Sequence, residues 1–235
     1  MVSKMDVQNC LAACLLFSKE VGLSSGSSDL SFLQIDWVKP PNDFLGTDSN
    51  PAIFVNEDTY RLLSRFHPNW ISNKTIALKE KILDYTPMLM VGIIAHEAGH
   101  AFNISKNISN TEANAYIFEI ECLRHLYQTN SSVLADCSTS DFLKYFNLRL
   151  PFYTKYSKQN PRLEALINMI NDESILTTAT KPAIAHFTPQ QTIRVFIPIG
   201  SLVYQRHRFF IPKTGIDKSY NSNRSSAPDN QKPLI

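Results

Sequence analysis

The sequence contains no long hydrophobic run and no block of like charge. None of its apolar stretches reaches the roughly 18–20 residues that a membrane-spanning helix needs. Its 23 Lys and Arg residues nearly balance its 21 Asp and Glu residues, so the formal net charge is +2. This balance, without any run of five or six like charges, gives no indication of a nucleic-acid partner. We therefore expect no transmembrane segment and no nucleic-acid binding.

Cysteine is also scarce. The four cysteines, Cys10, Cys14, Cys122 and Cys137, are too few to form a disulfide framework in a chain of 235 residues. Cys10 and Cys14 are spaced as on one face of a helix, but no CxxC pair or Cys/His cluster accompanies them. We expect all four to be reduced thiols.

The N-terminus does not have the pattern of a signal peptide. The residues LAAC at 11–14 have the local form of a bacterial lipoprotein cleavage site. However, Asp6, Gln8 and Asn9 interrupt the apolar run that must precede such a site. We expect residues 4–21 to form an amphipathic helix and the protein to be made in the cytosol.

The remaining patterns predict a mixture of helices and strands around one substantial core. Enrichment in β-branched and aromatic residues predicts strands at 32–38 and 52–55, and 75–83 is either a strand or the approach to a helix. Helices are expected at 58–66, 109–128, 139–147 and 161–172, the last entered through Pro161. The expected fold class is α+β.

The C-terminal part of the chain differs in composition from the rest. Residues 191–212 are rich in β-branched and aromatic side chains and predict a β-hairpin. From residue 213 the chain is Asn, Ser, Pro and charge, which predicts disorder. We therefore expect a catalytic domain over 1–190, a hairpin packed on it over 191–212, and a disordered polar tail over 213–235.

The segment "VGIIAHEAGHAF" at 91–102 contains the main indication of chemistry. Thr86 and Pro87 predict the start of a helix that is apolar on nearly every face and therefore buried. His96 and His100, at positions i and i+4, point the same way and could bind one metal ion. Glu97 projects to the side, where it could reach a metal-bound water. This is the HExxH arrangement of zinc metallopeptidases.

A chance occurrence of this motif is the alternative. Three fixed positions arise by chance in about one chain in a hundred or more. Buried polar groups without partners cost several kcal/mol, however, and a metal ion would supply the partner. The apolar surroundings therefore favour a metal site over coincidence.

A third ligand is needed, and the sequence excludes one way of supplying it. The extended motif, with Gly three residues and His six residues after the second histidine, does not fit Asn103 and Lys106. On the following helix, Glu112 and Glu119 both lie within the apolar stripe, whereas Glu121 points away from it.

Chain geometry distinguishes the two remaining glutamates. If the two helices form an antiparallel hairpin about a loop near residue 106, His100 faces Glu112 and His96 faces Tyr116. Glu112 is then the better candidate for the third ligand, with Glu119 as the alternative. A structural role for Glu112 stays open, because Ser109-x-x-Glu112 also fits a capping box.

Residues 88–123 resemble the gluzincin metallopeptidases, which pair an HExxH helix with a glutamate on a second helix. In several of them that glutamate opens an E-x-x-A-(acid or aromatic) stretch, and "EANAY" at 112–116 is similar. The resemblance implies a zincin-like domain in which His96, His100 and Glu112 bind Zn²⁺. It also implies that Glu97 is the general base in the hydrolysis of a peptide bond.

Two departures from that family concern the surroundings of the metal. The interval from His100 to Glu112 is short, and Tyr116 stands where many relatives have an aspartate behind the first histidine. A donor for the oxyanion, usually Tyr, His or Arg, is also required. Candidates for that donor, or for a residue that hydrogen-bonds to a metal ligand and orients it, are Tyr116, Glu119, Tyr153 and His186. Tyr156, Arg206 and His207 are also available.

These observations together predict a zinc-dependent endopeptidase that acts on a protein substrate. The alternative is a non-catalytic regulatory or peptide-binding module that uses the same scaffold to hold metal, although binding alone would not need Glu97. The polar tail resembles the C-terminal export signals of type IV effectors from intracellular bacteria such as Legionella. That resemblance implies export into a host cell. The chain length and the position of the HExxH motif near residue 96 are also similar to those of a Legionella effector metalloprotease, which implies a host cytosolic or cytoskeletal substrate such as actin.

Overall fold

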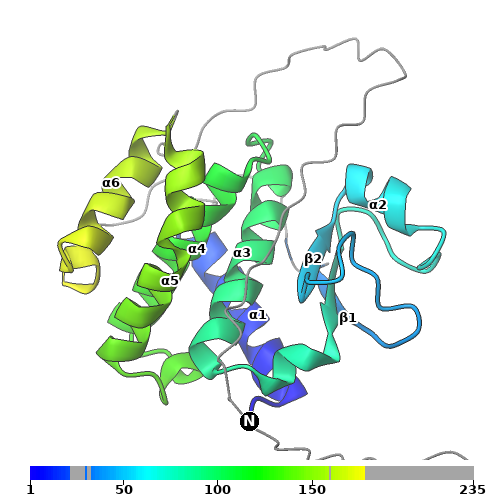
Figure 1. Ribbon diagram of the computed structural model, residues 1–235, viewed down its shortest axis with the longest axis horizontal. Coiled ribbons are helices and arrows are strands. Elements are labelled where there is room, and N and C mark those ends of the chain that lie inside the picture. Colours follow the sequence, from blue (N-terminus) through cyan, green and yellow to red (C-terminus); the bar gives the residue numbers. More distant parts are fainter. Residues whose placement is uncertain (22–29, 31–32, 159, 178–235) are drawn as a thin grey trace, which may run out of the picture.

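Helices and a small sheet make up the described part of the chain, which in this computed structural model comprises residues 1–21, 30, 33–158 and 160–177. Within those residues there are six α-helices and one three-stranded sheet, so the fold class is α+β (Figure 1). The elements are α1 (Lys4–Glu20), β1 (Gln34–Val38), β2 (Ala52–Val55), α2 (Glu57–Leu63), β3 (Thr75–Lys79), α3 (Pro87–Ser105), α4 (Glu112–Gln128), α5 (Thr139–Ser157) and α6 (Pro161–Asn171).

Helix α3 is the central element of the fold. Figure 1 shows it between helices α4, α5 and α6 on one side and the sheet on the other, and it contacts α1, α4, α5 and β2. Its start is as predicted: the Thr86 side chain accepts a hydrogen bond from the Leu89 amide, and Pro87 occupies the first turn. Most of its residues are buried, because neighbouring elements cover it on several sides. Any polar group on α3 must therefore find its partners inside the protein.

The sheet has the strand order β1-β3-β2, with β1 parallel and β2 antiparallel to β3. All five residues of the central strand β3 are buried. The carbonyls of Pro51 and Val55 accept hydrogen bonds from the amides of Lys79 and Asn73, on the β3 side. Because backbone direction alternates along a strand, the N–H and C=O groups of Ala52 and Phe54 face the free edge of the sheet.

Two element boundaries differ from the prediction. The segment 75–83 divides into strand β3 and a 3₁₀ helix over Glu80–Asp84. Helix α5 runs from Thr139 to Ser157 and so continues well past residue 147, with Pro151 inside it. A proline in a helix removes one backbone hydrogen bond, which packing of the helix can offset. The buried polar contacts of α5 described below provide such packing.

Helix α4 also corrects the prediction. It begins at Glu112 with Thr111 as its N-cap, and the Thr111 side chain accepts from the Asn114 amide. The capping box between Ser109 and Glu112 is therefore wrong. Glu121 does not point to solvent either: it is buried and forms ion pairs with Arg124, at 3.0 Å, and with Arg162. The reason is that α4 packs against α6 as well as α3, so a single apolar stripe underestimates its burial.

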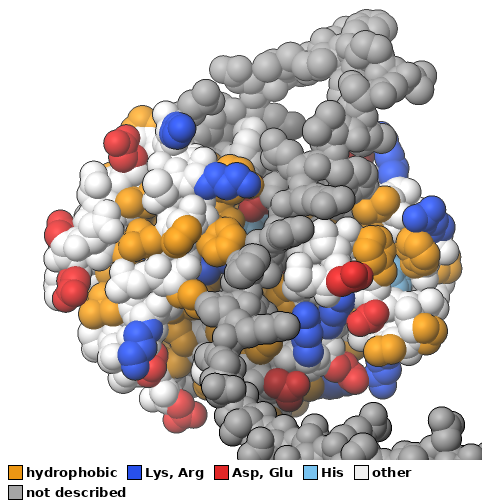
Figure 2. Space-filling model, in the orientation of Figure 1, with side chains coloured by type: hydrophobic (Ala, Val, Ile, Leu, Met, Phe, Trp, Pro, Cys, Tyr) orange, Lys and Arg blue, Asp and Glu red, His pale blue; other side chains and the backbone are white. Residues whose placement is uncertain are grey.

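The distribution of charge on the surface and the state of the cysteines agree with what the composition predicted. Figure 2 shows cationic and anionic side chains interspersed over the described part of one face. No helix among the described residues is long and apolar enough to cross a membrane. All four cysteines are free thiols, as expected. The expected hairpin at 191–212, the tail from 213, and His186, Arg206 and His207 lie outside the described residues.

Candidate metal and hydrolytic site

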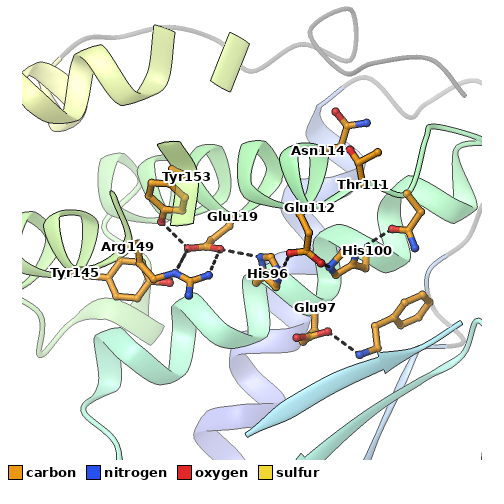
Figure 3. A network of polar contacts seen from close by, with 12 residues as sticks. His96, Glu97, His100, Thr111, Glu112, Asn114, Glu119, Tyr145, Arg149 and Tyr153 are labelled. Carbon is orange, nitrogen blue, oxygen red and sulfur yellow. Dashed lines mark hydrogen bonds and ion pairs between the residues drawn. The ribbon is translucent and has the colours of Figure 1, made fainter. Parts of the chain in front are cut away.

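His96 and His100 lie one turn apart on the same face of α3. Their ring centroids are 4.9 Å apart and the ring planes are perpendicular. His96 is 2% exposed, so its imidazole is almost completely removed from solvent. Both rings turn their Nε2 atoms toward the start of α4, where Glu112 lies (Figure 3).

Glu112 completes a set of three convergent donors. Its Oε2 is 3.4 Å from Nε2 of His96, and its Oε1 is 3.5 Å from Nε2 of His100. Two ligands bound tetrahedrally to Zn²⁺ at 2.0–2.1 Å lie roughly 3.3–3.4 Å apart. The donor types and these two nitrogen–oxygen distances therefore fit a zinc ion, and the three residues could hold one.

Gly99 explains how α4 comes close enough to α3 for this contact. A Cβ at this position would lie 3.0 Å from the Ala115 carbonyl oxygen and 3.1 Å from Cβ of Phe118. Even alanine would therefore need the neighbouring backbone to move. Glycine within a helix costs about 1 kcal/mol relative to alanine. Here its lack of a side chain allows the close approach of α4 that carries Glu112.

Glu119 supports His96 from the side away from Glu112. Its Oε2 accepts from Nδ1 of His96 at 3.0 Å, while its Oε1 accepts from the hydroxyls of Tyr145 at 2.7 Å and Tyr153 at 2.6 Å. The Arg149 guanidinium lies 3.3 Å from the same carboxylate (Figure 3). Burial raises the pKa of Glu119, but Arg149, His96 and Tyr153 outweigh burial and hold the pKa at about 2.

The three α5 residues that surround Glu119 lie on one face of their helix. Tyr145, Arg149 and Tyr153 are spaced four residues apart, so their side chains align. Room for the first comes from Gly92 of α3, where a Cβ would overlap the Tyr145 hydroxyl oxygen. Helix α5 is thereby connected to the orientation of His96 through a single buried carboxylate.

His100 has a simpler support. Its Nδ1 is 2.8 Å from Oδ1 of Asn110, in the loop that joins α3 to α4. An amide oxygen only accepts, so Nδ1 of His100 carries a proton, and Nε2 is the ring atom left for a metal ion. Glu119 imposes the same arrangement on His96. Partners of this kind behind a ligating imidazole fix its orientation and raise its basicity.

The charges around the imidazoles favour a cation. Burial lowers the pKa of His96, but its hydrogen bonds to Glu112 and Glu119 outweigh burial and raise the pKa to about 10. The pKa of His100 is also raised, because Glu112 outweighs burial there too. Burial would raise the pKa of Glu112, but the two histidines hold it well below its usual range. The site therefore stabilises positive charge between these residues.

Glu97 lies beside the donor set and at the edge of the sheet. Its Oε2 accepts a hydrogen bond from the Phe54 amide of β2 at 2.6 Å, and the residue is 4% exposed. The contact shows that the free edge of β2 runs directly past the donor set (Figure 3). Glu97 is not a member of the convergent donor set.

A cavity of about 590 Å³ opens over these residues. This volume is in the range of ordinary ligand sites. One wall comes from β2 and the start of α2, and the opposite wall comes from α5. Its lining includes His96, Glu97, His100, Glu112, Tyr116, Phe54, Asn50, Phe152, Lys155 and Tyr156.

The remaining sequence candidates separate into two groups. Tyr116 lines the cavity, and its ring centroid is 4.8 Å from that of His96, as the hairpin geometry predicted. Glu119 and Tyr153 lie behind His96, do not line the cavity, and are fully buried. Glu119 thus contacts Nδ1 and not the Nε2 side, where Glu112 lies.

Three residues of the site, Asn110, Tyr145 and Arg149, were not predicted from the sequence. For the last two a signal existed, because Tyr145, Arg149 and Tyr153 have the i, i+4, i+8 spacing of one helix face. The predicted helix ended before Pro151, however, and this hid the pattern. Asn110 belongs to a loop, and no periodicity identifies such a residue.

Comparison with known proteins adds nothing to this geometry. No protein-family model matches the chain, and no curated protein or solved structure is detectably similar to it.

Proposed function

We propose that this protein is a zinc-dependent peptidase. The observation that carries the proposal is the convergence of His96, His100 and Glu112 on one point, with Glu97 beside them in an open cavity. Two imidazoles and one carboxylate are a known donor set of catalytic zinc, which keeps one position open for water or substrate. A structural zinc site would instead be closed by a fourth protein ligand.

The residues of the site have different roles in the proposed hydrolysis. His96, His100 and Glu112 would hold the ion, and Glu119 and Asn110 keep the imidazoles oriented toward it. When bound, Zn²⁺ would lower the pKa of a water molecule to about 7 and would polarise a carbonyl. Glu97 accepts the proton of the attacking water and passes it to the leaving amine. The hydrogen bond from Phe54 holds Glu97 in place for this transfer.

A peptide is the substrate class that suits the cavity. The edge of β2 forms part of its wall, and the backbone N–H and C=O of Ala52 face outward there, where an extended peptide can pair through backbone hydrogen bonds. The opposite wall offers aromatic surface from Phe152 and Tyr156 together with the cation of Lys155. The proposed substrate is a protein segment in extended conformation, and a host cytoskeletal protein such as actin is the first to test.

Zinc content and proteolysis together test the proposal. Purified wild type should retain one zinc ion after dialysis and should generate new N-termini in a cell lysate and in purified actin. The Glu97→Gln variant should retain the metal and the fold but lose about 10²–10⁴ in rate, because an amide cannot accept the proton. Glu112→Gln should lose the metal.

Other outcomes would contradict the proposal in different ways. Equal proteolysis by wild type and Glu97→Gln would exclude Glu97 as the base. Zinc without any proteolysis would favour the non-catalytic binding module. Absence of zinc in wild type would leave the HExxH pattern as a coincidence.

A further inference from the structure

Three tyrosines surround His96, and they use their hydroxyls differently. Tyr145 and Tyr153 donate to Oε1 of Glu119, at 2.7 Å and 2.6 Å. Tyr116 is 4% exposed, yet its hydroxyl makes no hydrogen bond within the described residues. The hydroxyl is not among the buried polar atoms that lack a partner, so it is open to the cavity that Tyr116 lines.

The ring of Tyr116 is held firmly on several sides. Its centroid is 4.8 Å from that of His96, 5.1 Å from that of Tyr153 and 5.8 Å from that of Tyr156. The guanidinium carbon of Arg149 lies 5.3 Å from the same centroid. The ring therefore occupies a defined position in the wall of the cavity.

Tyr116 also lies close to the proposed metal ligands. Tyr116 lies one turn after Glu112 on α4, so both side chains are on the same face of the helix. Both line the cavity, together with His96 and Glu97. An unbonded, rigidly held donor thus stands at the wall of the cavity, next to the donor set.

We infer that Tyr116 is a catalytic residue that donates a hydrogen bond to the carbonyl oxygen of the scissile peptide as water adds to it. In that step the water oxygen bonds to the carbonyl carbon and one water proton moves to Glu97. The electron pair of the C=O double bond moves to the oxygen that Tyr116 contacts. When the C–N bond breaks, the carbonyl re-forms and the proton on Glu97 passes to the amine. This role rests on the proposed peptidase function.

The neighbouring tyrosines are less suited to the same role. The Tyr153 hydroxyl is committed to Glu119, and Tyr153 does not line the cavity. Tyr156 lines the cavity but is only partly buried. A donor held in a fixed position is worth more to a developing oxyanion than a mobile one in solvent.

The test uses the full-length chain with Tyr116→Phe, which removes only the hydroxyl. The substrate is a fluorogenic peptide that spans a cleavage site identified for wild type. We expect kcat to fall about 10²–10³-fold, with KM, zinc content and thermal midpoint unchanged.

Inhibitor binding provides a readout that is independent of turnover. A phosphinic peptide of the same sequence carries a tetrahedral centre with two oxygens, and its affinity should fall by a similar factor of about 10²–10³. A thiol peptide has no such oxygen and should bind wild type and variant equally. As the matched control, Tyr153→Phe should lower the thermal midpoint, because it removes a donor to Glu119.

The outcomes separate this inference from the proposed function. If wild type and Glu97→Gln are equally active, both fail. If wild type is active, Glu97→Gln is inactive and Tyr116→Phe keeps its full kcat, only the role of Tyr116 is overturned. A large fall in the thermal midpoint of Tyr116→Phe would also overturn it, because the hydroxyl would then be a structural bond.

Discussion

The two sides of His96 carry carboxylates in opposite circumstances. On the core side, Glu119 is fully buried and receives hydrogen bonds from Tyr145, Tyr153, Arg149 and His96. On the cavity side, the Glu112 side chain is 17% exposed and faces the Nε2 atoms of two imidazoles. The two glutamates are seven residues apart on one face of α4, so spacing alone does not distinguish them.

The difference shows how one helix can serve structure and chemistry at once. A carboxylate that is surrounded by fixed donors is a permanent part of the core, because any movement would leave buried charges without partners. A carboxylate beside imidazole lone pairs can instead accept a cation. The core side therefore orients His96, and the cavity side presents its Nε2 beside Glu112 and Nε2 of His100, where a cation could bind.

The largest effect is expected when the Glu119 carboxylate, on the core side of His96, is removed. Glu119→Leu should lower the free energy of unfolding by about 3–5 kcal/mol, because Arg149 is left buried without its partner carboxylate. Urea unfolding in the presence of EDTA measures this without interference from metal. The double variant Glu119→Leu/Arg149→Met should recover much of the loss. Equal stability of the single and double variants would show that Arg149 does not depend on Glu119.

The second largest effect is expected when acid protonates Glu119 on the core side of His96. The pKa of Glu119 is about 2 in the folded protein, below its unfolded value of about 4.3. The stabilisation from this shift is therefore present above about pH 4.3 and is lost as the pH falls toward 2, by about 3 kcal/mol in total. Metal-free Glu119→Gln should show a correspondingly smaller change in unfolding free energy over that range. Parallel pH profiles for the two proteins would contradict this account.

The smallest effect is expected at the other histidine. Asn110→Ala removes the acceptor for Nδ1 of His100, and loss of such a partner costs about 10–100-fold in metal affinity. We expect the lower end of that range and little change in unfolding free energy, because Asn110 lies in a loop and is only partly buried. Competition with a zinc chelator measures the affinity. Asn110→Asp keeps an acceptor and should bind zinc at least as well as wild type.

The parts of this arrangement that depend on local pattern were predictable from the sequence. Thr86 and Pro87 predicted the start of α3, and the i, i+4 spacing placed His96 and His100 on one face. The prediction that His100 faces Glu112 followed from treating α3 and α4 as an antiparallel hairpin about a short loop. Local periodicity and loop length are sufficient for such inferences, because both partners are close in sequence.

Long-range contacts could not be predicted in the same way. The position of Glu119 behind His96 depends on Tyr145 and Arg149 of α5, and on Gly92, which makes room for one of them. The predicted helix ended at residue 147, and this separated Arg149 and Tyr153 from Tyr145. The order of the strands, which makes β2 the edge, likewise depends on pairing across the chain and on no local signal.

The hydrogen bond between Glu97 and β2 has a consequence for aggregation. An edge strand exposes unpaired backbone groups that can pair with another chain. Here the chain's own side chains occupy both groups of Phe54 at that edge, since Glu97 accepts from its N–H and the Thr59 hydroxyl donates to its carbonyl at 3.2 Å. The same carboxylate that is proposed to move protons therefore also shields the sheet from self-association. Glu97→Ala would expose the Phe54 amide at this edge, so a loss of activity could then be caused by aggregation. Glu97→Gln is the better variant, because it retains an oxygen that can accept from Phe54.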